Sequence, residues 1–206
     1  MAELLLELLS EEIPARMQAR AAEDLLRLVE ARLDAEGIEV GAAHAFATPR
    51  RLALTIDGLP GRQIDRSQER KGTRVGAPDA AIQGFLKAVG LTSLDRCERR
   101  ASDKGEFWFA LSVQRGRPLP QVLLDILPAA LAEMPWPKSM RWADHKLRWV
   151  RPLTSILCLF DGRAVPLVFG HLTAGNRTRG HRFLKPDEFA VRDFADYKAK
   201  LAQAKV

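Results

Sequence analysis

The apolar positions of the first forty residues follow two different periods. Residues 4–9 are apolar except for Glu7 and stop at a polar segment, which predicts a short buried strand. From Pro14 to Gly37 the apolar side chains recur at the spacing of one helical face. These are Ala22, Leu25, Leu26, Val29 and Leu33. We therefore predict a core-facing helix with Ser10 or Glu11 as its cap and Gly37 as its terminator.

Residues 51–57 alternate between apolar and polar side chains, which is typical of a half-buried strand. Pro49 disfavours a helical conformation for Thr48 and cannot donate to a strand ladder. We therefore expect a corner at the end of a sheet, with the guanidinium groups of Arg50 and Arg51 in solvent. The polar, Arg- and Gly-rich residues 58–76 are interpreted as a loop.

The rest of the chain supplies further elements of both kinds. We predict a short helix over 79–90, a strand over 107–114, a helix from Pro120 that Pro128 kinks or splits, and a rigid loop over 134–142. Asp161-Gly162 separates two apolar runs and predicts a hairpin of residues 151–160 with 164–169. A final helix is predicted over 193–206.

Together these elements predict an α/β fold of the α+β type, with a mixed, mainly antiparallel sheet and helices packed on one face. We divide it into an N-terminal α/β subdomain, 1–116, and a basic subdomain that contains the hairpin, 117–206. Because the last helical pattern runs to Val206 without a cap, we expect a fragment of a longer chain.

Composition excludes several classes of protein. The 206 residues are 47% hydrophobic and 28% charged, no apolar run reaches the roughly 18 residues of a membrane span, and no signal peptide is recognisable. We therefore expect a cytoplasmic protein without membrane association. The two cysteines and four scattered histidines predict neither a disulfide framework nor a metal site. No glycine-rich phosphate loop or catalytic constellation is present, so we expect no catalytic residue.

Positive charge is concentrated late in the chain. Residues 134–185 hold ten Lys or Arg against two acids, whereas residues 1–40 hold ten acids against four bases. A basic field rich in arginine attracts polyanions and suits the phosphates of nucleic acid. The alternative is that these cations bind acidic protein surface, either the helix of residues 14–36 or another subunit.

Eight residues are candidates for RNA contact because they lie in basic loops or corners with Pro or Gly. They are Arg50, Arg51, Lys138, Arg141, Arg177, Arg179, His181 and Arg182. Arg51 is expected to face solvent or an interface, and Arg50 alternatively braces its turn by bonding carbonyls. Trp136 and Trp142 either stack on bases or cap the edge of a core. His181 either contacts a phosphate or base, where Gly180 lets the backbone approach the ligand, or is hydrogen-bonded within a turn.

Six short motifs resemble a known family. They are Leu-Leu-Glu-Leu-Leu-Ser-Glu-Glu-Ile-Pro at 5–14, Ala-Thr-Pro-Arg-Arg-Leu-Ala at 47–53, Lys-Gly-Glu at 104–106, Pro-Lys-Ser-Met-Arg-Trp at 137–142, Val-Arg-Pro at 150–152 and Thr-Arg-Gly-His-Arg-Phe at 178–183. In this order they resemble the N-terminal region of the beta subunit of bacterial glycyl-tRNA synthetase. The family's central HD-type domain and anticodon-binding domain would lie beyond Val206.

The resemblance implies a heterotetramer of alpha and beta subunits that joins glycine to its tRNA at the expense of ATP with Mg²⁺. In that family the catalytic site belongs to the alpha subunit, so this region would aid tRNA binding and subunit assembly, would bind no cofactor itself and would be inactive alone. Its partners would be the alpha subunit and glycine-accepting tRNA. Two rival hypotheses are a protein-interaction module that binds an acidic partner subunit without touching RNA, and an independent enzyme acting on RNA.

Overall fold

The computed structural model describes residues 2–102 and 105–206, so Lys104 of the Lys-Gly-Glu motif lies outside the described residues. The chain forms two compact units. Unit 1 combines the residues up to Gln63 with Arg117–Val206, and unit 2 comprises Ile64–Gly116. The candidate residues for RNA contact all belong to unit 1.

Unit 1 is built on a five-stranded sheet of order β2-β3-β1-β7-β8, in which all four pairings of neighbours are antiparallel. Its strands are β1 (Ala2–Ser10), β2 (Ala43–Thr48), β3 (Arg51–Leu59), β7 (Leu153–Phe160) and β8 (Arg163–Ala164). The strand predicted at residues 4–9 is confirmed and is the central one. Its apolar run does not alternate because both of its faces are buried.

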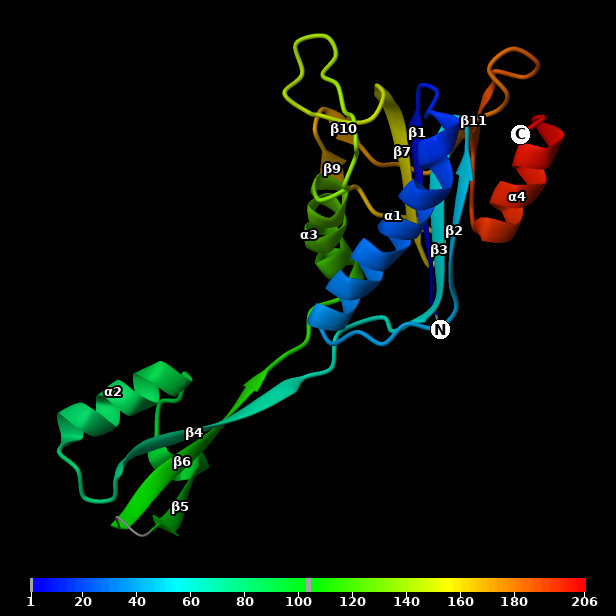
Figure 1. Cartoon of the computed structure of the whole chain (residues 1–206). Coiled ribbons are helices and arrows are strands. Elements are labelled where there is room, and N and C mark those ends of the chain that lie inside the picture. The colour runs from blue at the N-terminus through cyan, green and yellow to red at the C-terminus, as the bar shows by residue number, and fades with distance from the viewer. Residues whose placement is uncertain (1, 103–104) are drawn as a thin grey trace. The chain divides into compact units, whose positions relative to one another are not determined.

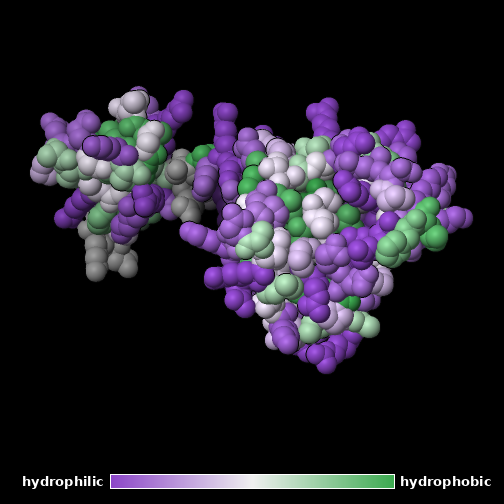
Figure 2. Space-filling model, turned by 90° about the horizontal axis from the view of Figure 1, so that it is seen from above, coloured by the Kyte–Doolittle hydropathy of each residue, from purple (hydrophilic) through white to green (hydrophobic). Residues whose placement is uncertain are grey.

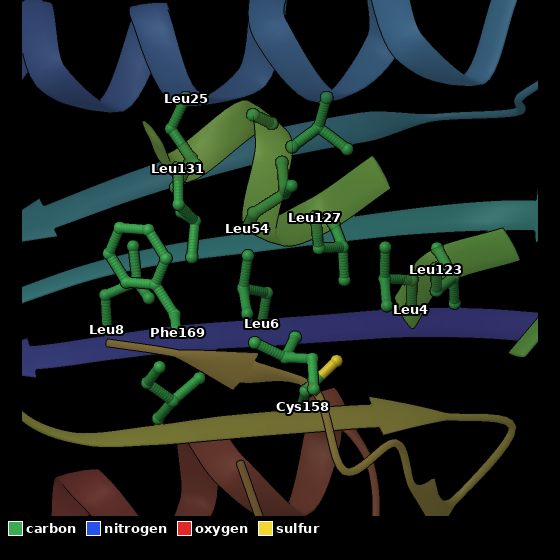
Figure 3. Close-up of a cluster of buried hydrophobic side chains, with 14 of the residues drawn as sticks. Leu4, Leu6, Leu8, Leu25, Leu54, Leu123, Leu127, Leu131, Cys158 and Phe169 are labelled. Atoms are coloured by element: carbon green, nitrogen blue, oxygen red, sulfur yellow. The ribbon is translucent and has the colours of Figure 1, made fainter. Parts of the chain in front are cut away.

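One face of the sheet is covered by α1 (Ala15–Ala35) and α3 (Leu119–Ala132) (Figure 1). Leu4, Leu6 and Leu8 of β1 meet Leu25 of α1 and Leu127 of α3 in the main core, and all five are at most 1% exposed (Figure 3). The predicted stripe of α1 is confirmed, with Leu26 only partly buried. The start of α1 differs from the prediction, because Pro14 is the N-cap residue and no side chain caps it.

The opposite face of the sheet carries α4 (Phe194–Gln203) (Figure 1). Tyr197 and Leu201 of α4 pack with Leu5, Leu157 and Leu159 in a second, smaller core. The helices of unit 1 therefore cover both faces of the sheet, whereas the sequence predicted helices on one face. The periodicity of a helix reveals that it has a buried side but not which face of the sheet that side meets.

The second half of unit 1 adds four short strands, β9 (Val168–Phe169), β10 (Leu172–Thr173), β11 (Arg177–Arg179) and β12 (Glu188–Ala190), which form the ladders β9-β10 and β11-β12. The predicted Asp161-Gly162 turn is confirmed, with φ angles of 50° and 72°. Its return strand is shorter than predicted, because β8 has two residues. Helix α3 continues through Pro128 without being divided.

Unit 2 is a three-stranded antiparallel sheet of order β4-β6-β5 with one helix. It consists of β4 (Arg66–Arg74), α2 (Asp79–Val89), the short 3-10 helix η1 (Leu94–Arg96), β5 (Cys97–Ser102) and β6 (Gly105–Gln114). The prediction of a loop over 58–76 is wrong, since β4 occupies half of it. The polar composition of β4 hid the strand, whose stabilisation comes from pairing with β6 rather than from an apolar run of its own.

The structure divides the chain differently from the predicted segments 1–116 and 117–206. Strand β1 pairs with β7, so the first and last parts of the sequence share one core. Unit 2 is inserted between Gln63 and Arg117, where the Gln63 backbone N–H donates to the Arg117 carbonyl at 2.9 Å. No helix among the described residues has the length and apolar character needed to cross a bilayer.

A pair of substitutions on α3 tests this core. Replacing the fully buried Leu127 by Ala should cost about 2–5 kcal/mol of the free energy of unfolding, because it removes buried methyl groups and leaves a cavity. Leu124→Ala on the same helix, at a position 38% exposed, should cost less than about 1 kcal/mol. Urea unfolding followed by tryptophan fluorescence measures both. Equal losses would contradict the packing of α3 described above.

Candidate nucleic-acid interface

The Pro49-Arg50 corner is a tight connection between β2 and β3, whose last pair is Thr48 with Arg51. The Arg50 side chain braces this connection with two hydrogen bonds to the end of β1 and the residue after it. Its Nε donates to the Ser10 carbonyl at 3.1 Å, and its Nη2 donates to Glu11 at 3.1 Å. Arg50 therefore has the carbonyl-bonding geometry considered for it in the sequence, and part of its charge is already compensated by Glu11.

Arg51 lies inside the protein instead of in solvent. Its side chain is 7% exposed and its Nε donates to Oε2 of Glu7, a fully buried carboxylate, at 3.0 Å. The expectation of exposed guanidinium groups at this corner is wrong for Arg51. The register explains the result: Arg51 is paired with Leu9 and Ala53 with Glu7, so Arg51 and Glu7 share the face of the sheet that α4 covers.

Glu7 is the centre of a buried network that sequence reasoning missed. Its carboxylate also accepts hydrogen bonds from the hydroxyls of Thr178 and Tyr197, and Arg51 donates in addition to the Arg179 carbonyl. We call Glu7, Arg51, Thr178 and Tyr197 the Glu7 network. It joins β1, β3, β11 and α4. The signal in the sequence is one carboxylate within an apolar strand, since a buried charge requires partners.

Burial raises the pKa of Tyr197 well above its usual value of 10.0, and the charge of Glu7 and the hydrogen bond to it add to the effect. The phenol therefore remains a donor to the Glu7 carboxylate throughout the neutral range.

Next to the Pro49-Arg50 corner lies a cavity of about 530 Å³ that we call the arginine cleft. Arg50, Arg177, Arg179 and Arg182 line it together with the acids Glu11 and Glu188. The structure thus brings four of the eight candidates together from the two ends of the sequence. Lys138 and Arg141 do not line it.

Ion pairs reduce the field of the arginine cleft. Arg177 Nε lies 3.1 Å from Glu188, and Arg182 Nη1 lies 3.4 Å from Glu11 and 3.1 Å from Glu12. Within the part of the chain that the structure describes, the exposed side chain of Arg179 forms no ion pair. Arg179 is therefore the cleft arginine best placed to meet an external anion.

His181 and Gly180 stabilise the turn that follows β11, His181 by hydrogen bonds and Gly180 by allowing close packing. The His181 ring accepts the backbone N–H groups of Phe183 and Leu184 at Nδ1, at 3.3 and 3.2 Å, which is the hydrogen-bonded arrangement considered for it. A Cβ on Gly180 would meet the Lys185 carbonyl oxygen at 2.1 Å and the Ala204 Cβ at 2.8 Å. The close approach that Gly180 permits is thus to Lys185 and Ala204 of the chain itself.

A second basic surface lies on the loop of residues 134–149. Its four cations, Lys138, Arg141, Lys146 and Arg148, are exposed, and its acid is Asp144. Among the described residues none of these cations forms an ion pair, although Arg148 donates to the hydroxyl and carbonyl of Ser139. The loop and the cleft therefore differ: the cleft has more arginines, and the loop has more uncompensated charge.

The tryptophans near this loop have separate roles. Trp136 packs edge-on against the buried Trp149, with ring centroids 4.9 Å apart, and so covers the edge of the core. Trp142 instead contacts the rings of His145 and His171 at 6.2 and 5.9 Å. Seen from above, the end of unit 1 that carries these loops is largely hydrophilic, with apolar patches between the polar side chains (Figure 2).

The remaining reactive groups do not assemble into a site. Burial raises the pKa of the Cys158 thiol to about 12, so it remains protonated in the core. No group of three or more potential metal ligands occurs among residues 2–102 and 105–206. The described cations form two surfaces: a cleft in which three of the four arginines are ion-paired, and a loop of cations without ion pairs among the described residues.

Comparison with known proteins gives one consistent result. A family model described as "Glycyl-tRNA synthetase beta subunit" matches residues 4–206. The chain is 48% identical to the glycine–tRNA ligase beta subunit of Rhodospirillum centenum and 51% identical to that of Paracoccus denitrificans, and each alignment covers 100% of this chain. The corresponding subunit of Cereibacter sphaeroides is 51% identical over 99% of the chain. The chain spans 30 to 32% of the length of these relatives.

We expect removal of the Glu7 and Glu188 carboxylates to lower the free energy of unfolding by different amounts, because only Glu7 is buried. Glu7→Gln leaves the buried Arg51 without a counter-charge and should cost about 3–5 kcal/mol of the free energy of unfolding. Glu188→Gln removes the partner of Arg177 in an exposed pair and should cost at most about 1 kcal/mol. Urea unfolding at neutral pH measures both losses, and a similar small loss for the two variants would contradict a buried ion pair.

Tyr197 is the only tyrosine of the chain, so its ionisation can be followed directly by phenolate absorbance. The pKa of Tyr197 is higher in the folded state than in the unfolded one. The contribution of its neutral phenol to the free energy of unfolding is therefore complete below about pH 10 and is lost as the pH rises further. We expect the phenolate of the native chain to appear only together with alkaline unfolding. Tyr197→Phe should lose less stability between about pH 9 and about pH 11 than the parent chain does. A native phenol that titrates near pH 10 would refute this.

Proposed function

Because the chain belongs to the family of glycyl-tRNA synthetase beta subunits, we propose that it is the N-terminal region of such a subunit and serves ATP-dependent formation of glycyl-tRNA. The observation that carries this proposal is the similarity along the whole chain to proteins named glycine–tRNA ligase beta subunit. In this assignment the chain works in a heterotetramer in the cytoplasm. Its direct partners are the alpha subunit and glycine-accepting tRNA.

The proposed contribution of this chain is to bind tRNA and to assist assembly rather than to perform the chemistry. The catalytic site, with ATP and Mg²⁺, is assigned to the alpha subunit. This division of labour is supported by the chemistry of the described residues, whose surface clusters are cations suited to phosphate and not a nucleophile with an adjacent base. The chain alone is expected to be inactive in aminoacylation.

We assign the tRNA contact to the arginine cleft and to the loop of residues 134–149. Arginine forks bind phosphate oxygens in pairs, and contacts of this kind position the RNA without reading its sequence. Arg50, Arg177 and Arg182 are held in place by Glu11, Glu12 and Glu188, while Arg179 is unpaired among the described residues. Arg51 supports the cleft from below through the Glu7 network and is not assigned a contact with RNA.

The test is binding of the chain to glycine-accepting tRNA and to an unrelated tRNA, measured by fluorescence anisotropy at several salt concentrations. We expect affinity that falls steeply with salt for both RNAs, because phosphate contacts release counterions. Stronger binding of the glycine-accepting tRNA would show that this region also contributes to recognition. Absence of binding at low salt would refute the proposed tRNA contact.

Arg179→Ala should weaken this binding about fivefold to tenfold and reduce the salt slope by about one charge. Lys198→Ala is the matched control, since Lys198 is an exposed cation on α4 that lies against the Phe194 ring, outside the cleft. It should leave affinity and slope nearly unchanged. An equal effect of the two variants would show that overall charge, rather than the arginine cleft, determines binding.

A second candidate function, contact with a protein partner, is favoured by the tip of the β11-β12 connection. Phe183 and Leu184 are 77% and 70% exposed there, and Phe183 lines a mainly apolar hollow of about 440 Å³ next to the arginine cleft. If this tip binds the alpha subunit, Phe183→Ser with Leu184→Ser should abolish copurification of the alpha subunit while tRNA binding persists. Val168→Ser, at a position 59% exposed on β9, is the control.

A further inference from the structure

Two histidines form a stacked pair beside the loop of residues 134–149. The rings of His145 and His171 lie 3.7 Å apart between centroids, with 1° between their planes. His145 belongs to the loop, and His171 belongs to the connection between β9 and β10. Trp142 meets both rings edge-on, so the pair is supported on one side by a large aromatic surface.

The loop that carries His145 is rich in cations. The charged residues of the loop are Lys138, Arg141, Asp144, Lys146 and Arg148, four of them positive. The segment 168–173 that holds His171 has no other charged residue. Strand β7, against which β10 packs, contributes only the buried Cys158 thiol. Helix α3, which packs on β9, contains one acid, Asp125, and Glu133 follows as its C-cap residue; each is ion-paired with an arginine elsewhere.

This environment disfavours charge on the His171 imidazole. Desolvation and the neighbouring His145 lower the pKa of His171 below its usual 6.5. Two stacked imidazolium ions whose ring centroids lie 3.7 Å apart would repel each other. His171 is nevertheless exposed, so an anion can reach the ring.

From this geometry we infer that the His145–His171 pair and the cations of the 134–149 loop form a phosphate-binding surface for RNA that takes up protons when the RNA binds. Phosphate groups neutralise the repulsion between the cations and add an attraction for each imidazolium. RNA binding and protonation of the pair therefore favour each other. The inference rests on the proposed function in that it takes the tRNA as the polyanion.

The coupling between RNA binding and protonation of the histidines predicts the direction in which affinity changes with pH. Because bound RNA favours the charged imidazoles, affinity should rise as the pH falls through their titration range. If RNA raises one histidine pKa by about one unit, the affinity below that range is up to about tenfold higher than above it. Phosphate monoanions of the RNA backbone keep their charge throughout this range, so the change reports on the protein.

The test is anisotropy of the chain with glycine-accepting tRNA from about pH 8 to about pH 5.5 at constant ionic strength, where histidine is the side chain that ordinarily titrates. Calorimetry in two buffers of different ionisation enthalpy then measures proton uptake directly. We expect up to about a tenfold gain in affinity at the acidic end and net proton uptake near pH 6.5. His145→Asn with His171→Asn should abolish most of both effects and leave affinity at about pH 8 close to that of the parent chain.

His44→Asn is the matched control, since His44 is exposed on β2, away from this loop. It should retain the full pH dependence. Lys146→Ala with Arg148→Ala should reduce the salt slope by about two charges, because these residues would contact the same phosphates.

The outcomes separate this inference from the proposed function. Absence of tRNA binding at every pH would refute the tRNA contact on which both rest. Binding that is strong and salt-dependent, but equally dependent on pH with and without the histidine pair, would overturn the inference and leave the proposed function standing. Loss of pH dependence in the histidine variant alone would support it.

Discussion

The buried ion pair between Glu7 and Arg51 is the contact on which the arrangement of unit 1 depends. Taking both charges out of water is costly, and the cost is offset only because the Glu7 oxygens also accept hydrogen bonds from Thr178 and Tyr197. These partners come from distant parts of the sequence. One strand residue thereby fixes where the corner of β2 and β3, the strand β11 and the helix α4 lie, and with them the position of the arginine cleft.

Charge in this protein separates into two kinds of surface. Three of the four cleft arginines are held by nearby glutamates, which gives them defined positions and weakens the field, whereas the cations of the 134–149 loop lack such partners among the described residues. A preformed site with low net charge favours geometric fit, and an unpaired basic loop favours attraction at longer range. The basic segment of residues 134–185 therefore contributes to two surfaces that differ in how far their positive charge is compensated by acids.

Local patterns in the sequence were sufficient for β1, α1, α4 and the Asp161-Gly162 turn, since each is specified by its own periodicity or turn residues. Local patterns were insufficient where a segment distant in the sequence determines whether residues form a strand or are buried. Strand β4 is polar and depends on β6, and Arg51 is buried because Glu7, forty-four residues earlier, faces it. The resemblance of short motifs identified the family, but it could not show that Arg51 lies beneath the surface while Arg179 lies on it.

The insertion of unit 2 has a consequence for how the chain can vary. The residues on either side of it are already joined by backbone hydrogen bonds, from Gln63 to Arg117 and from Leu119 to Gly61. A change in the length of a segment whose ends are held together in this way adds little closure cost to the sheet of unit 1, because loop entropy varies only slowly with length. Residues 64–116 can therefore change in length or sequence as one unit at little energetic cost to the core and the Glu7 network of unit 1.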